Sequence, residues 1–138
     1  MTATLRVSTF ALLAILSLPS LASGPNDLIQ HYSRQAASEQ AGFTPNAKRG
    51  AAFYRQPFAS STEMPACVSC HTEQPGLPGR HAITGKRILP LAPAANNERF
   101  SDPAKVEKWF GRNCRDVLGR ACSAAEKADF IAYLNEVR

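Results

Sequence analysis

The stretch Cys67-Val68-Ser69-Cys70-His71 decides how this chain folds, because it carries the pattern C-x-x-C-H. Two cysteines three positions apart lie on one turn, where each can form a thioether with one vinyl group of a haem. The adjacent histidine reaches the iron from the same side, as its proximal ligand. We therefore predict one covalently attached haem c, with its iron, held by Cys67, Cys70 and His71.

Two other interpretations compete with haem attachment at this pattern. A thioredoxin-like redox pair lies after a strand and at the start of a helix, whereas residues 60–65, Ser-Ser-Thr-Glu-Met-Pro, precede this one. A structural zinc site could recruit all four cysteines, at 67, 70, 114 and 122. The second pair is spaced C-x7-C, outside the usual C-x2-4-C ligand spacing. Both interpretations are weaker than haem attachment.

Residues 1–22 form a predicted secretory signal peptide. One positive charge, Arg6, precedes the apolar run of residues 7–18, and the small residues Ser20 and Ala22 favour cleavage after Ala22. The run is shorter than the ~20 apolar residues of a membrane span, which disfavours an uncleaved anchor, and no later segment is apolar enough to cross a bilayer. We expect a soluble periplasmic protein without stable membrane insertion, in a compartment where spare thiols oxidise.

Residues 23–138 suffice for one cytochrome c domain and are too few for two independent cores, which excludes a large multidomain enzyme. Hydrophobic residues make up 44% of the chain and charged residues 20%, so a disordered chain is excluded as well. Without Arg6, fifteen basic residues stand against eleven acidic ones, a net charge of +4. This mild excess does not indicate nucleic-acid binding.

Helical spacing of apolar residues predicts two helices before the C-x-x-C-H motif, over residues 26–40 and 46–55. Gly50, in the second of them, lowers helix propensity. A glycine there lets another helix cross closely, and we expect that partner to be the last segment of the chain.

Two further helices are predicted after the motif. Asp102 and Pro103 supply the N-cap and first residue of one helix. Residues 123–126, Ser-Ala-Ala-Glu, form a capping box that begins the other, whose apolar face runs to Val137. Residues 74–100 hold four prolines and three glycines, which predicts a long loop that wraps the cofactor. The fold class is therefore all-α.

The sixth iron ligand remains open on the residues alone. No methionine follows His71, and Met64 is tethered only three residues before Cys67, so the common methionine-ligated electron carrier is disfavoured. His81 is chemically the best remaining donor, although it lies only ten residues past His71. The other donors are Lys86, Cys114, Cys122, Asn96, Asn97, Asn113 and Asn135.

Several runs after the motif carry a resemblance to a known family. They are Thr84-Gly85-Lys86, Pro90-Leu91-Ala92-Pro93, Arg99-Phe100, Lys105-Val106-Glu107-Lys108-Trp109, Arg112-Asn113-Cys114, Gly119-Arg120 and Cys122. The chain resembles the sphaeroides haem protein family over nearly all of residues 23–138. That family consists of high-spin cytochromes with the small class I cytochrome c fold and an asparagine as sixth ligand. The resemblance implies His71 as proximal ligand, Asn113 as distal ligand and a Cys114–Cys122 disulfide.

The resemblance also implies a function. The family's asparagine leaves the iron on reduction, and the vacant site binds oxygen, nitric oxide or carbon monoxide. The implied redox partner is a dihaem cytochrome c or a membrane cytochrome b. We thus predict an electron-accepting, gas-binding periplasmic cytochrome. A turnover enzyme that reduces oxygen, nitric oxide or peroxide at the open site is an open but disfavoured alternative, because the sequence shows no distal acid–base group. The other alternative is a simple low-spin electron carrier with His81 or Lys86 as a stable sixth ligand.

The chemistry of Asn113 agrees with this implied mechanism. An amide oxygen is a weak, hard donor that suits ferric iron better than ferrous iron, so an added electron should loosen it. We expect Asn113 near Gly111, where the helix of Trp109 ends, and the competing interpretation is a helix C-cap asparagine. The cations Lys48, Arg49, Arg80, Lys86 and Arg87 either meet haem propionates and an acidic redox partner or form a solvated face.

Overall fold

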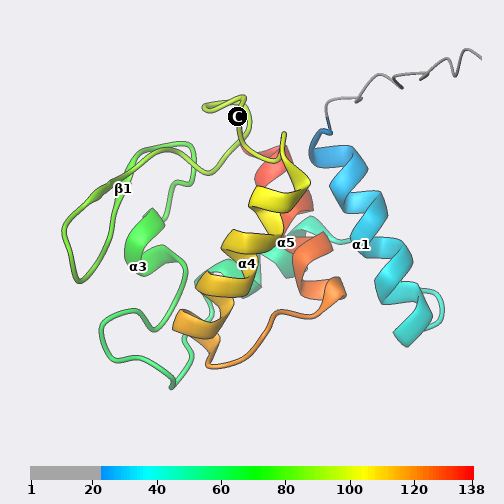
Figure 1. The fold of residues 1–138 in the computed structure, drawn as a ribbon, viewed down its shortest axis with the longest axis horizontal. Helices are drawn as coiled ribbons and strands as arrows, with labels where there is room; N and C mark the ends of the chain where they lie inside the picture. Colours follow the sequence, from blue (N-terminus) through cyan, green and yellow to red (C-terminus); the bar gives the residue numbers. More distant parts are fainter. Residues whose placement is uncertain (1–22) are drawn as a thin grey trace, which may run out of the picture.

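The computed structural model describes residues 23–138, so the predicted signal peptide and its cleavage after Ala22 lie outside the described residues. This part of the chain contains five helices and one pair of very short strands (Figure 1). In order they are α1 (Pro25–Glu39), α2 (Ala47–Arg55), α3 (Val68–His71), β1 (Gly79–Arg80), β2 (Arg87–Ile88), α4 (Pro103–Leu118) and α5 (Ala124–Glu136). The prediction of an all-α fold is confirmed. Within residues 23–138, no helix has the length and apolar character that a bilayer crossing requires.

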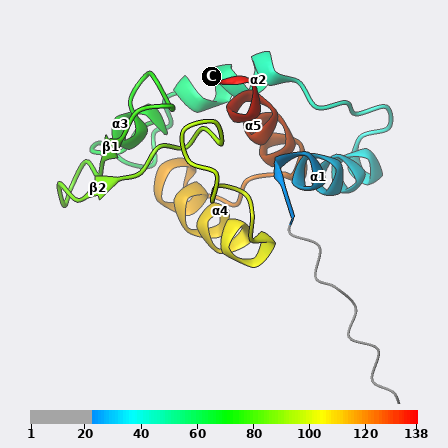
Figure 2. The same ribbon diagram turned by 90° about the horizontal axis from the view of Figure 1, so that it is seen from above.

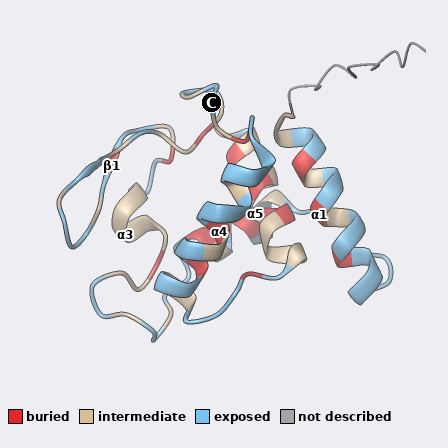
Figure 3. Cartoon of the chain, in the orientation of Figure 1, coloured by how far each residue is buried: buried red, intermediate tan, exposed pale blue. Residues whose placement is uncertain are grey.

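Helix α5 is the centre of the core, because it packs against both α1 and α2. Its side chains Ala128, Ile131 and Leu134 are fully buried, as the predicted apolar face requires. Figures 1 and 2 both show α3 with the strand pair on one side of the molecule and α1 on the other, with α4 and α5 between them. Figure 3 shows the buried residues gathered where α1, α4 and α5 meet.

The close helix crossing expected at Gly50 is present. A β-carbon added to Gly50 would lie 2.0 Å from the backbone oxygen of Asp129 in α5, so only glycine fits. Beside this contact, the buried carboxylate of Asp129 accepts hydrogen bonds from Arg49 Nε (2.7 Å), Arg49 Nη2 (2.9 Å) and the backbone N–H of Asn46 (2.6 Å). A charge-assisted pair with a third hydrogen bond thus fixes α2 on α5.

Local capping explains where the helices begin. Asn46 accepts a hydrogen bond from Arg49 N, and Asp102 accepts one from Lys105 N, each as an N-cap. Ser123 and Glu126 form the predicted capping box at the start of α5. The helices predicted over residues 26–40 and 46–55 are observed as Pro25–Glu39 and Ala47–Arg55, so their positions were predicted to within one residue.

Helix α4 corrects the prediction that the helix of Trp109 ends near Gly111. It continues to Leu118 and stops at Gly119, which has a left-handed conformation with φ of 73°. Glycine in a helix interior costs only ~1 kcal/mol relative to alanine. Phe110 and Cys114, one turn apart on either side of Gly111, are buried in the core and outweigh that cost. Asn113 therefore lies inside a helix, and its interpretation as a C-cap is wrong.

The long loop predicted over residues 74–100 is largely irregular, but it contains the antiparallel pair β1–β2, which the sequence analysis missed. Gly79 faces Ile88 and Arg80 faces Arg87 in this two-residue register. The guanidinium of Arg80 also donates to the carbonyl of Gly85 at 2.7 Å. Such a short ladder leaves no room for the alternation by which a strand is recognised in a sequence.

Candidate haem site

The C-x-x-C-H motif forms a single helical turn. Cys67 is the N-cap of α3, and the backbone N–H of His71 donates to the carbonyl of Cys67 at 3.1 Å. Both thiols of the motif are free. The structure thus presents two free thiols and an imidazole on one turn, as the attachment of haem c requires.

Burial sets the protonation state of this turn. Burial, together with a smaller effect of the positive charge of Arg99, lowers the pKa of His71 to about 4. The imidazole is therefore neutral near pH 7, which is the form that binds iron. Burial also raises the pKa of the Cys67 thiol to about 11. The turn thus fits a haem whose iron is bound by His71.

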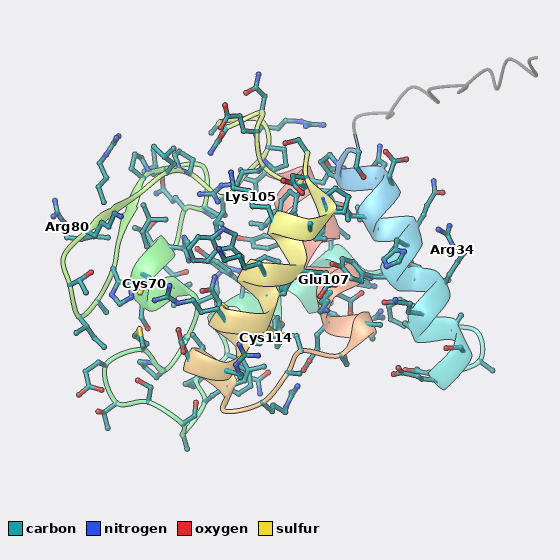
Figure 4. The ribbon with its side chains drawn as sticks, viewed as in Figure 1. Arg34, Cys70, Arg80, Lys105, Glu107 and Cys114 are labelled. Atoms are coloured by element: carbon teal, nitrogen blue, oxygen red, sulfur yellow. A yellow bond between two sulfur atoms is a disulfide. The ribbon has the colours of Figure 1, made fainter. Side chains whose placement is uncertain are left out.

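The strand pair lies directly against this turn. A β-carbon on Gly79 would lie 2.0 Å from the carbonyl oxygen of Cys70, so the chain passes the turn at a position where only glycine fits. The backbone N–H of Ala82 points at Cys70 Sγ at 3.2 Å. Figure 4 shows Cys70 on α3 and Arg80 on the neighbouring segment that forms the strand pair.

Arg99 joins the two ends of the loop of residues 89–99, close enough to His71 for its charge to affect the imidazole. Its Nε donates to the carbonyl of Pro90 and its Nη2 to the carbonyl of Leu89, both at 2.7 Å. The side chain is partly buried, and burial lowers the pKa of its guanidinium from the ordinary value. The sequence analysis included Arg99 only as part of a matching run and gave it no role, because both of its partners are backbone carbonyls.

A second residue that the sequence analysis missed is Tyr54. Its buried hydroxyl donates to the carbonyl of Thr72, directly after His71, at 2.6 Å. Thr72 has a φ of 65°, a conformation rare outside glycine, and this hydrogen bond helps to hold it. The only sequence signal was that Tyr54 follows Gly50 by one helical turn.

Asn113 lies on the exposed face of α4. Trp109, one turn earlier on that face, is 43% exposed, whereas Phe110 and Cys114 face the core. Cys114 is joined to Cys122 by a disulfide, with 5.6 Å between their Cα atoms. The residue next to Asn113 is therefore tied to the chain that enters α5, which holds the backbone of Asn113 in place.

Three other candidates have different surroundings. The Nδ1 atom of His81 accepts two backbone hydrogen bonds, from Ile83 and Thr84, both at 3.3 Å, so this ring atom is engaged in its own turn. Lys86 is exposed, and Met64 is partly buried. The interpretation as a four-cysteine zinc site is wrong, because Cys114 and Cys122 form a disulfide. Among the described residues, no group of three or more His, Cys, Asp or Glu side chains could hold a metal ion.

These features define a class of protein. A small helical fold with a C-x-x-C-H turn, free thiols and a neutral imidazole is that of a c-type cytochrome. The comparisons identify the family. The chain is 44% identical over 124 residues to the cytochrome c-type protein SHP of Cereibacter sphaeroides, covering 88% of this chain and 92% of that protein. It is 43% identical over 109 residues to cytochrome c″ of Methylophilus methylotrophus, covering 78% and 76%.

Solved structures agree with the sequence relatives. A structure described as oxidised SHP, an oxygen binding cytochrome c, matches with a TM-score of 0.74 and 41% identity, covering 81% of this chain and 96% of that one. Oxidised cytochrome c″ from M. methylotrophus matches with a TM-score of 0.75 and 40% identity, covering 83% and 94%. Residues 40–134 also match the family described as a domain of unknown function (DUF1924).

The chain belongs to the family of SHP and cytochrome c″, the family whose resemblance the sequence carries. Its fold is the all-α class I cytochrome c fold, and it is a haem-containing cytochrome.

Proposed function

We propose that this cytochrome carries a single covalent haem c in the periplasm, accepts electrons there, and binds oxygen, nitric oxide or carbon monoxide at the reduced iron once Asn113 has left it. Two relatives support the gas-binding and release steps. SHP is described as an oxygen binding cytochrome c, and a solution structure of cytochrome c″ is described as giving insight into haem-ligand detachment. That second structure matches this chain with a TM-score of 0.72 and 42% identity.

Two sets of residues have different roles at the site. Haem supplies the iron that takes up an electron and binds the gas. Cys67 and Cys70 hold the group covalently, and His71, kept neutral by burial, is the permanent proximal ligand. Asn113 offers an amide oxygen as the second, replaceable ligand.

The position of Asn113 is the observation that carries the proposal. Its side chain lies on the exposed face of α4, and among the described residues no hydrogen bond holds its amide. The amide is thus free to bind ferric iron and free to swing away when an added electron weakens that bond. The Cys114–Cys122 disulfide ties the neighbouring residue to the segment that enters α5, so the backbone of Asn113 stays in place and the same side chain can return.

The proposed electron donor is the dihaem cytochrome c or membrane cytochrome b that the resemblance implies. Physical support comes from three exposed cations, Arg80 and Arg87 on the strand pair and Lys86 directly before β2. No acidic residue occurs between Glu73 and Glu98, so these three cations give the segment a net positive charge. Such a segment favours encounter with an acidic partner surface.

Visible spectra of the protein, matured with haem in an exporting host, test the gas-binding function. We expect a high-spin ferrous spectrum that shifts promptly when carbon monoxide is added. Asn113→Ala should retain its haem but change the ferric spectrum. A low-spin ferrous spectrum that is indifferent to the gas would contradict the proposal and indicate a stable sixth ligand such as His81. Amino-terminal sequencing of periplasmic protein should begin at Ser23.

A further inference from the structure

Tyr54 connects the proximal side of the haem site to a second tyrosine. Its hydroxyl donates to the carbonyl of Thr72, the residue bonded to His71, at 2.6 Å. Burial is the largest of several effects that raise the pKa of Tyr54, so the phenol stays protonated and remains a donor. One peptide unit and one short hydrogen bond therefore separate the proximal histidine from a buried, oxidisable ring.

Tyr133 continues this connection to the surface. The ring centroids of Tyr54 and Tyr133 are 5.6 Å apart. Tyr133 is only partly buried and lines a surface cavity of ≈ 490 Å³ together with Glu73. Its hydroxyl accepts a hydrogen bond from Arg55 Nη2 at 3.2 Å, and Arg55 Nε donates to Glu73 at 2.9 Å. A carboxylate and open solvent are thus both near the phenol, so a proton leaving Tyr133 has acceptors.

The geometry points to a further activity: Tyr54 and Tyr133 form a relay that carries oxidising equivalents from the proximal side of the haem to the protein surface. The oxidant is a peroxide. The inference rests on the haem attachment in the proposed function, because His71 and Thr72 form the first part of the relay. It does not depend on which gas binds.

Peroxide takes two electrons and two protons, its O–O bond breaks, and two waters form. The first electron comes from Tyr54 and is replaced from Tyr133, and Tyr133 at the surface is then restored by an electron and a proton from Tyr133 of a second molecule. The second electron follows the same route from Tyr54 and the restored Tyr133, so each molecule is left with one Tyr133 radical, and the protons go to water or Glu73. Two Tyr133 phenoxyl radicals on different molecules then couple through a carbon–carbon bond. Overall, one peroxide and two Tyr133 side chains give two waters and one dityrosine cross-link.

Two other oxidisable side chains make the assignment testable. The chain has three tyrosines and one tryptophan. The hydroxyl of Tyr32, which is also buried, donates to Glu107 at 2.6 Å rather than to the chain beside His71. Trp109 lies on α4, the helix of Asn113. Tyr32→Phe and Trp109→Phe are therefore matched controls that leave the relay intact.

The experiment treats the ferric holoprotein with hydrogen peroxide, followed by rapid freezing and electron paramagnetic resonance, and by peptide mapping of dityrosine. Asn113→Ala is treated in parallel, because its ferric iron is open to peroxide. We expect a tyrosyl radical and a cross-link at Tyr133. Tyr133→Phe should lose the cross-link, and Tyr54→Phe should lose the radical at Tyr133 while its haem is bleached faster. Tyr32→Phe and Trp109→Phe should behave as the native chain.

Tyr133→Phe removes only a partly buried hydroxyl, so its result counts even where Tyr54→Phe lowers stability. The relay is overturned if the radical persists in both relay variants, if it disappears in Tyr32→Phe or Trp109→Phe, or if peroxide bleaches the haem without any tyrosyl radical. A haem that peroxide leaves unchanged, in the native chain and in Asn113→Ala alike, overturns it too. Carbon monoxide binding to the reduced native protein is measured on the same preparation, so failure of the relay and failure of the gas site are separate results.

Discussion

The region of α1, α2 and α5 and the region from residue 60 to residue 100 are built in different ways. In the helical region, large apolar side chains such as Tyr32, Ile131 and Leu134 are fully buried. In the second region the buried hydrophobic residues are only Ala66, Ala92 and Phe100. That region is held by backbone hydrogen bonds and by the side chains of Tyr54 and Arg99. Apolar burial therefore stabilises the first region, while the second is arranged around the haem-binding turn.

Gly50→Ala should break the helical region and have the largest effect. The new β-carbon would overlap the Asp129 backbone oxygen at 2.0 Å, and backbone cannot move aside as a side chain can. We expect a loss of ~3 kcal/mol or more in the free energy of unfolding, measured by denaturant titration of the holoprotein. Gly111→Ala is the control, because its nearest heavy atom would be the end of Arg115 at 3.7 Å, and it should stabilise by ~0.5–1 kcal/mol. Equal stabilities for the two variants would refute the close crossing.

Gly79→Ala should break the second region and leave the first intact. The β-carbon would overlap the carbonyl of Cys70 at 2.0 Å and push the strand pair away from the haem-binding turn. We expect a large drop in the fraction of chains with attached haem, read from intact mass, while the chains that mature keep their helical circular dichroism. Normal attachment would contradict the assigned role of this contact.

Replacing both Cys114 and Cys122 by serine tests how α4, the helix of Asn113, is joined to the helical region. The bridge closes nine residues, which the chain-entropy account values at about 2.6 kcal/mol of stability. We expect a loss of that order in the unfolding free energy, together with slower return of Asn113 to the iron after reoxidation, followed by stopped-flow absorbance. Unchanged return kinetics would show that the bridge stabilises the helices without restraining Asn113.

Glu126→Gln should give the smallest effect, and one that depends on pH. Burial raises the pKa of this carboxyl, but hydrogen bonds from Arg120 and Ser123 outweigh it and hold the pKa below its usual value. A carboxylate with a lowered pKa stabilises the fold above its unfolded pKa, and this contribution is lost as the pH falls through the folded value. We expect a cost of ~0.5–1 kcal/mol at pH 7 that shrinks below pH 4. A cost that is the same at both pH values would contradict the role of the charge.

Sequence patterns predicted what local interactions determine. The starts of α2, α4 and α5 follow from Asn46, Asp102 and Ser123, whose caps involve residues within one turn. The end of α4 was mispredicted because burial of Phe110 and Cys114 overrides the local preference of Gly111.

The residues of the haem site also differ in how far the sequence predicts them. Cys67, Cys70 and His71 are recognisable from their spacing alone. Tyr54 and Arg99 contact backbone far along the chain, at Thr72 and Pro90, and leave no local pattern. Asn113 is one of several possible donors by chemistry and was singled out only by the family resemblance.

The central claim is that Asn113 binds ferric iron and leaves it on reduction. Resonance Raman spectra of one sample, before and after addition of a single electron, test this most directly, because the marker bands report coordination number and spin state. The account predicts six-coordinate high-spin iron in the ferric protein and five-coordinate high-spin iron in the ferrous protein. Six-coordinate iron in both oxidation states would contradict it.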